Sequence, residues 1–95
     1  MSLSPTLPTL AFYRRDDCYL CDEARVDLQA VLEDRVKRGD PIARVREINL
    51  ADQPHLETRY GALIPVIAVD GQELTLVMGR RVINLFLDRV LGRAA

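Results

Sequence analysis

The chain has 95 residues, and its 13 Lys and Arg against 14 Asp and Glu give a formal net charge of −1. This length supports one hydrophobic core and excludes two separate ones. Nucleic-acid binding normally requires a clear excess of basic residues, so the balanced charge predicts no nucleic-acid partner. No apolar run approaches the ~20 residues that cross a bilayer, so we also expect no membrane partner.

Residues 1–8 lack the positively charged region and the apolar stretch of a signal peptide. We therefore expect a flexible lead-in at residues 1–8, a single domain at residues 9–95 and a cytoplasmic location. In that reducing compartment, two cysteines are more often catalytic or metal-binding than a permanent disulfide.

The first two elements follow directly from the pattern. Residues 9–13 are apolar and bounded by charge, which indicates a buried strand. After Cys18, apolar residues recur every three or four positions, which predicts an amphipathic helix that ends at Gly39. The apolar stripe of this helix comprises Leu20, Ala24, Leu28, Val31, Leu32 and Val36.

Residues 42–50 form a less regular candidate strand. Val45, Ile48 and Leu50 do not alternate cleanly, so we expect a bulge or an uncertain register in its pairing. Asp52 is expected to cap a short helix that runs to Tyr60.

The remaining pattern is a hairpin followed by a helix. Asp70-Gly71 separates two β-rich runs within residues 65–77, and this dipeptide favours a two-residue turn. A last amphipathic helix then ends at Gly92; its apolar residues are Val82, Ile83, Phe86, Leu87, Val90 and Leu91. The order βαβ-α-ββα predicts an α/β fold, with a four-stranded mixed sheet that carries helices on its faces.

The chemistry-bearing motif is the pair Cys18 and Cys21. Cys18 falls between the first strand and the first helix, where the helix N-terminus stabilises a thiolate. Cys21 follows one turn later, within reach of a disulfide, and Cys-x-x-Cys at this junction is a redox signature. The alternative is that the two cysteines are small buried hydrophobic residues without a redox role. A structural zinc site needs four ligands and His55 is the only other soft donor, so we expect no metal.

The segment 12–24, which contains Cys18-Tyr19-Leu20-Cys21, resembles the active site of glutaredoxins. It is most similar to short bacterial glutaredoxin-like proteins with a Cys-x-Leu-Cys motif. The resemblance implies a thioredoxin-like fold, a glutaredoxin-like domain at residues 9–95 and a catalytic pair, Cys18 and Cys21. It also implies that the Ile64-Pro65 bond is cis, and that both residues line the active site and bind an extended substrate.

The resemblance assigns further substrate-binding positions, with departures. Arg15 occupies the place of a basic residue that holds a glutathione carboxylate, although a solvated loop charge explains it equally well. Tyr19 either lines the thiol groove or lies exposed, whereas Leu20 is expected to face the core. Gly79 and Arg80 stand where glutaredoxins have two glycines and an acidic residue, and this difference weakens the case for glutathione.

Together these features predict a monomeric thiol–disulfide oxidoreductase acting on protein or small-molecule disulfides. It would need no bound cofactor, and glutathione is a candidate reductant or co-substrate. One alternative is a binding module with weak redox activity that recognises a peptide or protein partner beside Pro65. Another is an iron–sulfur cluster held by Cys18 of two chains with glutathione.

Overall fold

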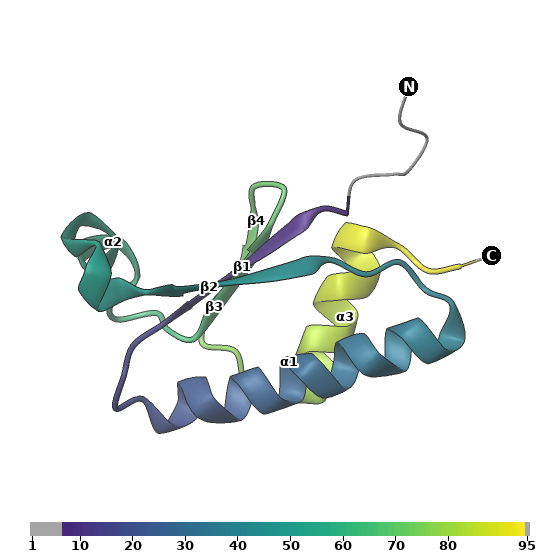
Figure 1. Ribbon diagram of the computed structural model, residues 1–95, viewed down its shortest axis with the longest axis horizontal. Helices are drawn as coiled ribbons and strands as arrows, with labels where there is room; N and C mark the ends of the chain where they lie inside the picture. The colour runs from purple at the N-terminus through teal and green to yellow at the C-terminus, as the bar shows by residue number, and fades with distance from the viewer. Residues whose placement is uncertain (1–6, 95) are drawn as a thin grey trace.

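The computed structural model describes residues 7–94, so residues 1–6 of the expected lead-in lie outside the described residues. The strands are β1 (Thr9–Arg14), β2 (Arg44–Asn49), β3 (Val66–Val69) and β4 (Gln72–Leu74). The helices are α1 (Tyr19–Arg38), α2 (Pro54–Tyr60) and α3 (Arg80–Leu91), with a 3-10 turn, η1, at Leu50–Asp52. Figure 1 shows this arrangement, which confirms the expected element order.

The four strands form one mixed sheet in the order β2-β1-β3-β4. β1 pairs with β2 in parallel, whereas β3 pairs antiparallel with both β1 and β4. A parallel pair needs a crossover connection, and α1 provides it. The predicted α/β class is therefore confirmed, and the sheet places the end of β1 next to the start of α1.

The main core lies between the sheet and the helices α1 and α3, which run along the same side of it (Figure 1). Leu10 and Phe12 point from β1 into this core, as does Ile67 from β3. Tyr13 and Val66 alternate with them and pack into a second cluster with Leu50 and Tyr60. The rings of Tyr13 and Tyr60 stack with their centroids 4.2 Å apart. α2 is thus anchored against the opposite face of the sheet.

β2 is more regular than its sequence predicts. Its residues pair one for one with β1, from Thr9 with Arg44 to Arg14 with Asn49, so the expected bulge is wrong. β2 is an edge strand with mostly exposed side chains, and such a strand does not need clean alternation. The irregularity came from Leu50, which belongs to η1 and is buried in the second cluster.

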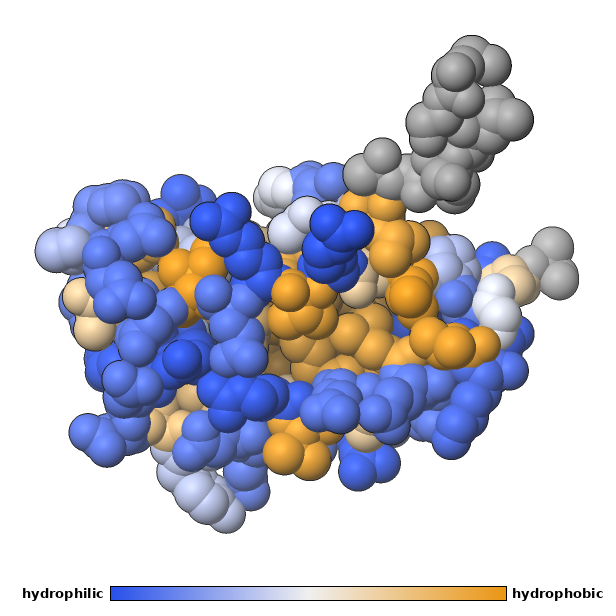
Figure 2. Space-filling view, viewed as in Figure 1, coloured by the Kyte–Doolittle hydropathy of each residue, from blue (hydrophilic) through white to orange (hydrophobic). Residues whose placement is uncertain are grey.

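The apolar stripe of α1 is only partly buried. Ala24, Leu28 and Val31 lie in the core as expected, but Leu20 is 39% exposed and Val36 is 60% exposed. Leu32 and Val36 line an open groove between α1 and β2, which Figure 2 shows as an apolar hollow, so this part of the stripe meets solvent. In its last turn the fully buried residue is Arg35.

The cap of α2 differs from the prediction, whereas the hairpin turn does not. Asp52 lies within η1 and does not cap α2; the residue before α2 is Gln53, whose side chain makes no capping bond. Pro54 defines this helix start instead, because proline has the backbone angle of a first helical residue and lacks the N–H that would be unpaired there. The Asp70-Gly71 turn is as expected, with φ of 49° and 79°.

Candidate active site

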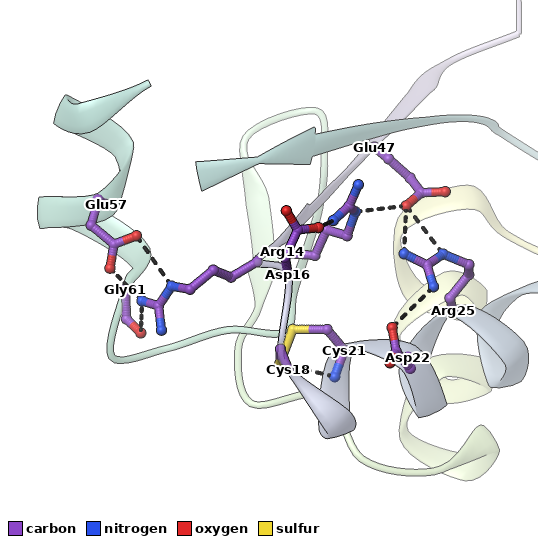
Figure 3. Close-up of a disulfide and its surroundings, with 10 residues drawn as sticks. Arg14, Asp16, Cys18, Cys21, Asp22, Arg25, Glu47, Glu57 and Gly61 are labelled. Carbon is purple, nitrogen blue, oxygen red and sulfur yellow. Dashed lines mark hydrogen bonds and ion pairs between the residues drawn. A yellow bond between two sulfur atoms is a disulfide. The ribbon is translucent and has the colours of Figure 1, made fainter. Parts of the chain in front are cut away.

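Cys18 is positioned by the junction between β1 and α1. It is the N-cap residue of α1, in an extended conformation, and its Sγ accepts a hydrogen bond from the backbone N–H of Cys21 at 3.1 Å. Its carbonyl accepts the N–H of Asp22 at 3.1 Å, which is the first turn of the helix. One N–H group of the helix start, that of Cys21, therefore points at the sulfur (Figure 3).

Cys18 and Cys21 form a disulfide with their Cα atoms 5.1 Å apart, within the usual range for such a bond. The two residues differ in accessibility. Cys21 is fully buried, whereas Cys18 is partly exposed at the edge of the main core. An external disulfide can therefore approach the Cys18 sulfur, while Cys21 can react only with its neighbour.

Two of the acidic residues near the cysteines, Asp16 and Asp22, are held by arginines. Asp16 accepts hydrogen bonds from Arg14 at 2.8 Å and from Asn49 at 3.2 Å, and these bonds hold the pKa of its carboxyl below the usual value. Further along, Arg25 donates to Asp22 at 3.2 Å and to Glu47 at 3.0 Å, and Glu47 also accepts from Arg14 (Figure 3). This ion-pair network joins β1, β2 and α1 around the dithiol.

Arg15 reaches away from the dithiol to the end of α2. Its guanidinium pairs with the carboxylate of Glu57 and donates to the carbonyl of Gly61 at 3.2 Å (Figure 3). A Cβ at Gly61 would lie 2.5 Å from the Glu57 carbonyl oxygen, so this close approach requires glycine. The side chain predicted to hold a glutathione carboxylate is thus already bound by a carboxylate of the protein.

The Ile64-Pro65 peptide bond is cis, as the resemblance implied. Pro65 is buried, and its carbonyl accepts the N–H of Val77 at 2.9 Å. The N–H of Ile64 donates to the carbonyl of Tyr60 at 3.1 Å. Within residues 7–94, the Ile64 carbonyl is the backbone group of this pair that makes no hydrogen bond, and the substrate-binding role of both residues stays a prediction.

The other predicted binding residues lie at the starts of two helices, Tyr19 in α1 and Gly79 and Arg80 at α3. Tyr19 is 73% exposed, and a hydrogen bond to Glu23 raises the pKa of its hydroxyl. Gly79 caps the start of α3 with φ of 90°, and Arg80 lies 3.6 Å from Asp27 of α1. Their roles in binding also stay predictions.

Gly79 also borders a cleft that the sequence did not indicate. The cleft measures about 480 Å³ and lies between α1 and the segment leading into α3. Leu20, which we had expected in the core, and Met78 both line it. One feature of the sequence could have indicated this cleft: Val26 is an apolar residue outside the apolar stripe of the helix, and it lines the cleft.

Comparison with known protein families finds one family whose model matches most of the chain. The glutaredoxin-like domain (DUF836) matches residues 9–89. The chain belongs to this family. The glutaredoxin-like domain therefore joins a thioredoxin-like fold to a close cysteine pair, which gives it the elements of redox chemistry.

Solved structures agree on the fold of this glutaredoxin-like domain. The structural-genomics target XcR50 from X. campestris is 28% identical, with 84% of this chain and 96% of that chain covered and a TM-score of 0.66. Protein Ne2328 from Nitrosomonas europaea is 22% identical over 90% and 98%, with a TM-score of 0.64. A thioredoxin variant from Halobacterium salinarum is 15% identical over 90% and 76%, with a TM-score of 0.66. No curated protein matches the chain.

Two further observations bear on the expectations for metal and membrane. Within residues 7–94, no group of three or more His, Cys, Asp or Glu is arranged to hold a metal ion. His55 is exposed on α2. Over the same residues, no helix has both the length and the apolar character needed to span a bilayer.

Proposed function

We propose that the protein is a thiol–disulfide oxidoreductase that works through Cys18 and Cys21. The observation that carries this proposal is the asymmetry of the pair at the start of α1. Cys18 is partly exposed and accepts the N–H of Cys21, while Cys21 is buried at disulfide distance. Such a site favours a thiolate at the accessible position and keeps the second thiol for an internal reaction.

The reaction starts from the reduced pair. The Cys18 thiolate attacks one sulfur of the substrate disulfide, forms a mixed disulfide and releases one substrate thiolate, which takes a proton from water. Cys21, losing its proton, then attacks the Cys18 sulfur and releases the second substrate thiol. Two electrons pass to the substrate, and Cys18 and Cys21 are left as the disulfide seen in the structure.

An external thiol must supply the two electrons that reset the pair. The proposal includes protein or small-molecule disulfides as substrates in the cytoplasm, and no bound cofactor, because thiol exchange needs none. Glutathione remains a candidate reductant. The Arg15–Glu57 pair favours protein disulfides over glutathione as substrate, because the guanidinium expected to receive glutathione is engaged.

The test is to equilibrate the purified protein in glutathione buffers of graded potential and to read the thiol states by mass spectrometry. We expect a reversible Cys18–Cys21 disulfide near the range of glutaredoxins, roughly −200 to −230 mV. Cys21→Ser should accumulate mixed disulfides on Cys18, and Cys18→Ser should form none.

A pair that stays reduced at every potential, with no adduct on Cys21→Ser, would contradict the proposal. In that case the fold would serve as a binding module, and its partner should remain bound after both cysteine substitutions. Circular dichroism of each variant checks that the fold survives the substitution.

A further inference from the structure

The cleft beside the dithiol combines an apolar floor with acidic edges. It begins at the first turn of α1, where Leu20 and Asp22 flank Cys21, and continues to the segment that leads into α3. Its lining is apolar or acidic: Leu20, Ala24, Val26, Val77, Met78 and Gly79 with Asp22, Glu23 and Asp27. Every charged group in this lining is a carboxylate.

The apolar part of this cleft is open to solvent. Leu20 is 39% exposed, Val26 is 60% exposed and Met78 is 63% exposed. Small proteins rarely leave several large apolar side chains together at the surface unless a ligand or partner covers them. The wall of the cleft includes both chain neighbours of Cys21, Leu20 and Asp22, so a segment that covered the cleft would lie close to the dithiol.

The charge around the dithiol is acidic. Residues 14–27 contain five Asp and Glu against three Arg. Each of these arginines is already paired: Arg14 with Asp16 and Glu47, Arg15 with Glu57, and Arg25 with Asp22 and Glu47. Across the cleft, Arg80 lies 3.6 Å from Asp27. These four arginines are therefore paired with carboxylates of the protein itself, and among the described residues no basic one lines the cleft.

Among the acidic residues that line the cleft, Glu23 is the one that this pairing leaves without an arginine partner. Within the part of the chain that the structure describes, its carboxylate has no ion pair and accepts a hydrogen bond from the hydroxyl of Tyr19. A bound ligand would meet an unpaired negative charge there and no unpaired positive one. Charge complementarity therefore favours a cation in the cleft.

We propose that this cleft binds the part of a protein disulfide substrate in which basic residues and an apolar side chain flank the reacting cysteine. The proposal rests on the thiol–disulfide activity proposed above and defines its substrate class. It also implies that anionic disulfides, including oxidised glutathione with its carboxylates, react poorly. The apolar side chain would lie on Leu20 and Met78, and the basic group would face Glu23 and Asp27.

The chemistry of exchange is unchanged by this selection. The Cys18 thiolate attacks the peptide disulfide and one peptide thiol leaves; Cys21 then attacks Cys18 and releases the second. Two electrons pass from the protein dithiol to the peptide disulfide, and dithiothreitol can restore the dithiol for the next round. The cleft acts only by raising the local concentration of substrates that fit it.

The test uses the full protein, reduced with dithiothreitol and desalted, and four disulfides. Three are symmetrical dimers of capped peptides with one cysteine each: one flanked by Lys and Leu, one by Lys and Ser, and one by Glu and Leu. The fourth is neutral hydroxyethyl disulfide. Acid quenching followed by mass spectrometry gives the rate at which the Cys18–Cys21 disulfide forms. Each rate is divided by the rate at which dithiothreitol reduces the same disulfide, which corrects for the intrinsic reactivity of that disulfide.

We expect the Lys–Leu peptide to react about tenfold faster than the Glu–Leu peptide and several-fold faster than the Lys–Ser peptide. Replacing an exposed carboxylate typically changes an interaction by up to about fivefold, so Glu23→Gln with Asp27→Asn should remove most of the charge preference. Asp34→Asn is the matched control, because Asp34 is exposed on the same helix outside the cleft. It should keep the full preference.

The neutral disulfide separates the two proposals. If hydroxyethyl disulfide oxidises the pair but the Lys–Leu and Glu–Leu peptides react equally, the cleft proposal is overturned and the redox function stands. The same conclusion follows if the Glu23 and Asp27 double variant retains the full preference. If no disulfide, neutral or charged, oxidises the pair, the redox function fails and the substrate proposal fails with it.

Discussion

Arg35 carries a positive charge in the core at the end of α1. Its side chain is fully buried, donates to Asp88 at 2.8 Å and to the Pro41 carbonyl at 2.6 Å, and also bonds the carbonyl of Gly92. These three acceptors lie on the loop after α1 and on the end of α3. The guanidinium of Arg35 therefore joins the end of α1 to the loop that follows it and to the end of α3.

Arg35→Ala should lower the free energy of unfolding by about 3–5 kcal/mol, because it removes a fully buried side chain and leaves Asp88 and the carbonyls of Pro41 and Gly92 without their donor. Urea titration followed by circular dichroism measures this change. Lys37→Ala, on the exposed side of the same helical turn, should remain within about 0.5 kcal/mol of the unaltered protein. An Arg35→Ala protein as stable as Lys37→Ala would show that water replaces these bonds without cost.

At the scale of elements, Glu47 connects β2 to β1 and α1. It accepts hydrogen bonds from Arg25 at 3.0 Å and from Arg14 at 3.0 Å, and the bonds from Arg25 chiefly hold the pKa of its carboxyl below the ordinary 4.5. A depressed pKa stabilises the fold above pH ~4.5, where the unfolded carboxyl is ionised as well. The stabilisation is lost as the pH falls through the folded pKa.

Glu47→Gln should therefore destabilise the fold at pH 7 by about 1 kcal/mol or less, since the carboxylate is partly exposed and screened. At pH 3 the difference in free energy of unfolding between the two proteins should be smaller. Part of the Glu47 carboxylate is then protonated in the unaltered protein, which weakens its pairing with Arg14 and Arg25. Urea unfolding at both pH values measures it. A difference that stays constant from pH 7 to pH 3 would mean that Glu47 acts by packing and not by charge.

The elements that the sequence predicted well are those set by neighbouring residues. The Asp70-Gly71 turn and the left-handed Gly39 after α1, with φ of 78°, each follow from local backbone preferences. The contacts that it could not predict join distant residues. Arg15 meets Glu57 across 42 positions and Arg35 meets Asp88 across 53, and nothing in a single sequence pairs them.

The site shows the same division. The cysteine pair was predicted because Cys-x-x-Cys is a local sequence motif. The cis bond before Pro65 was predicted because the resemblance to glutaredoxins implies it. The cleft was missed because helical periodicity assigns Leu20 to the apolar stripe of α1. Whether that stripe is covered at its first turn depends on where the sheet ends, which is a property of the tertiary fold.

At the scale of the whole molecule, charge is uneven although the total is only −1. A nearly neutral protein has little long-range field, so any attraction of a basic substrate must come from the carboxylates near the dithiol. Such local attraction extends over about the Debye length, which is ~8 Å at physiological ionic strength and ~3 Å at 1 M salt. Salt should therefore weaken it without altering the thiol chemistry.

Raising NaCl from about 0.05 M to 1 M should slow the reaction of the reduced protein with the Lys–Leu peptide disulfide several-fold, because screening shortens the reach of Glu23 and Asp27. The rate with neutral hydroxyethyl disulfide should hardly change over the same range, and the Glu–Leu peptide should become slightly faster as repulsion is screened. Quenched-flow mass spectrometry measures all three rates. Equal slowing of every disulfide would instead locate the salt effect at the dithiol itself, since only a shared step can affect charged and neutral substrates alike.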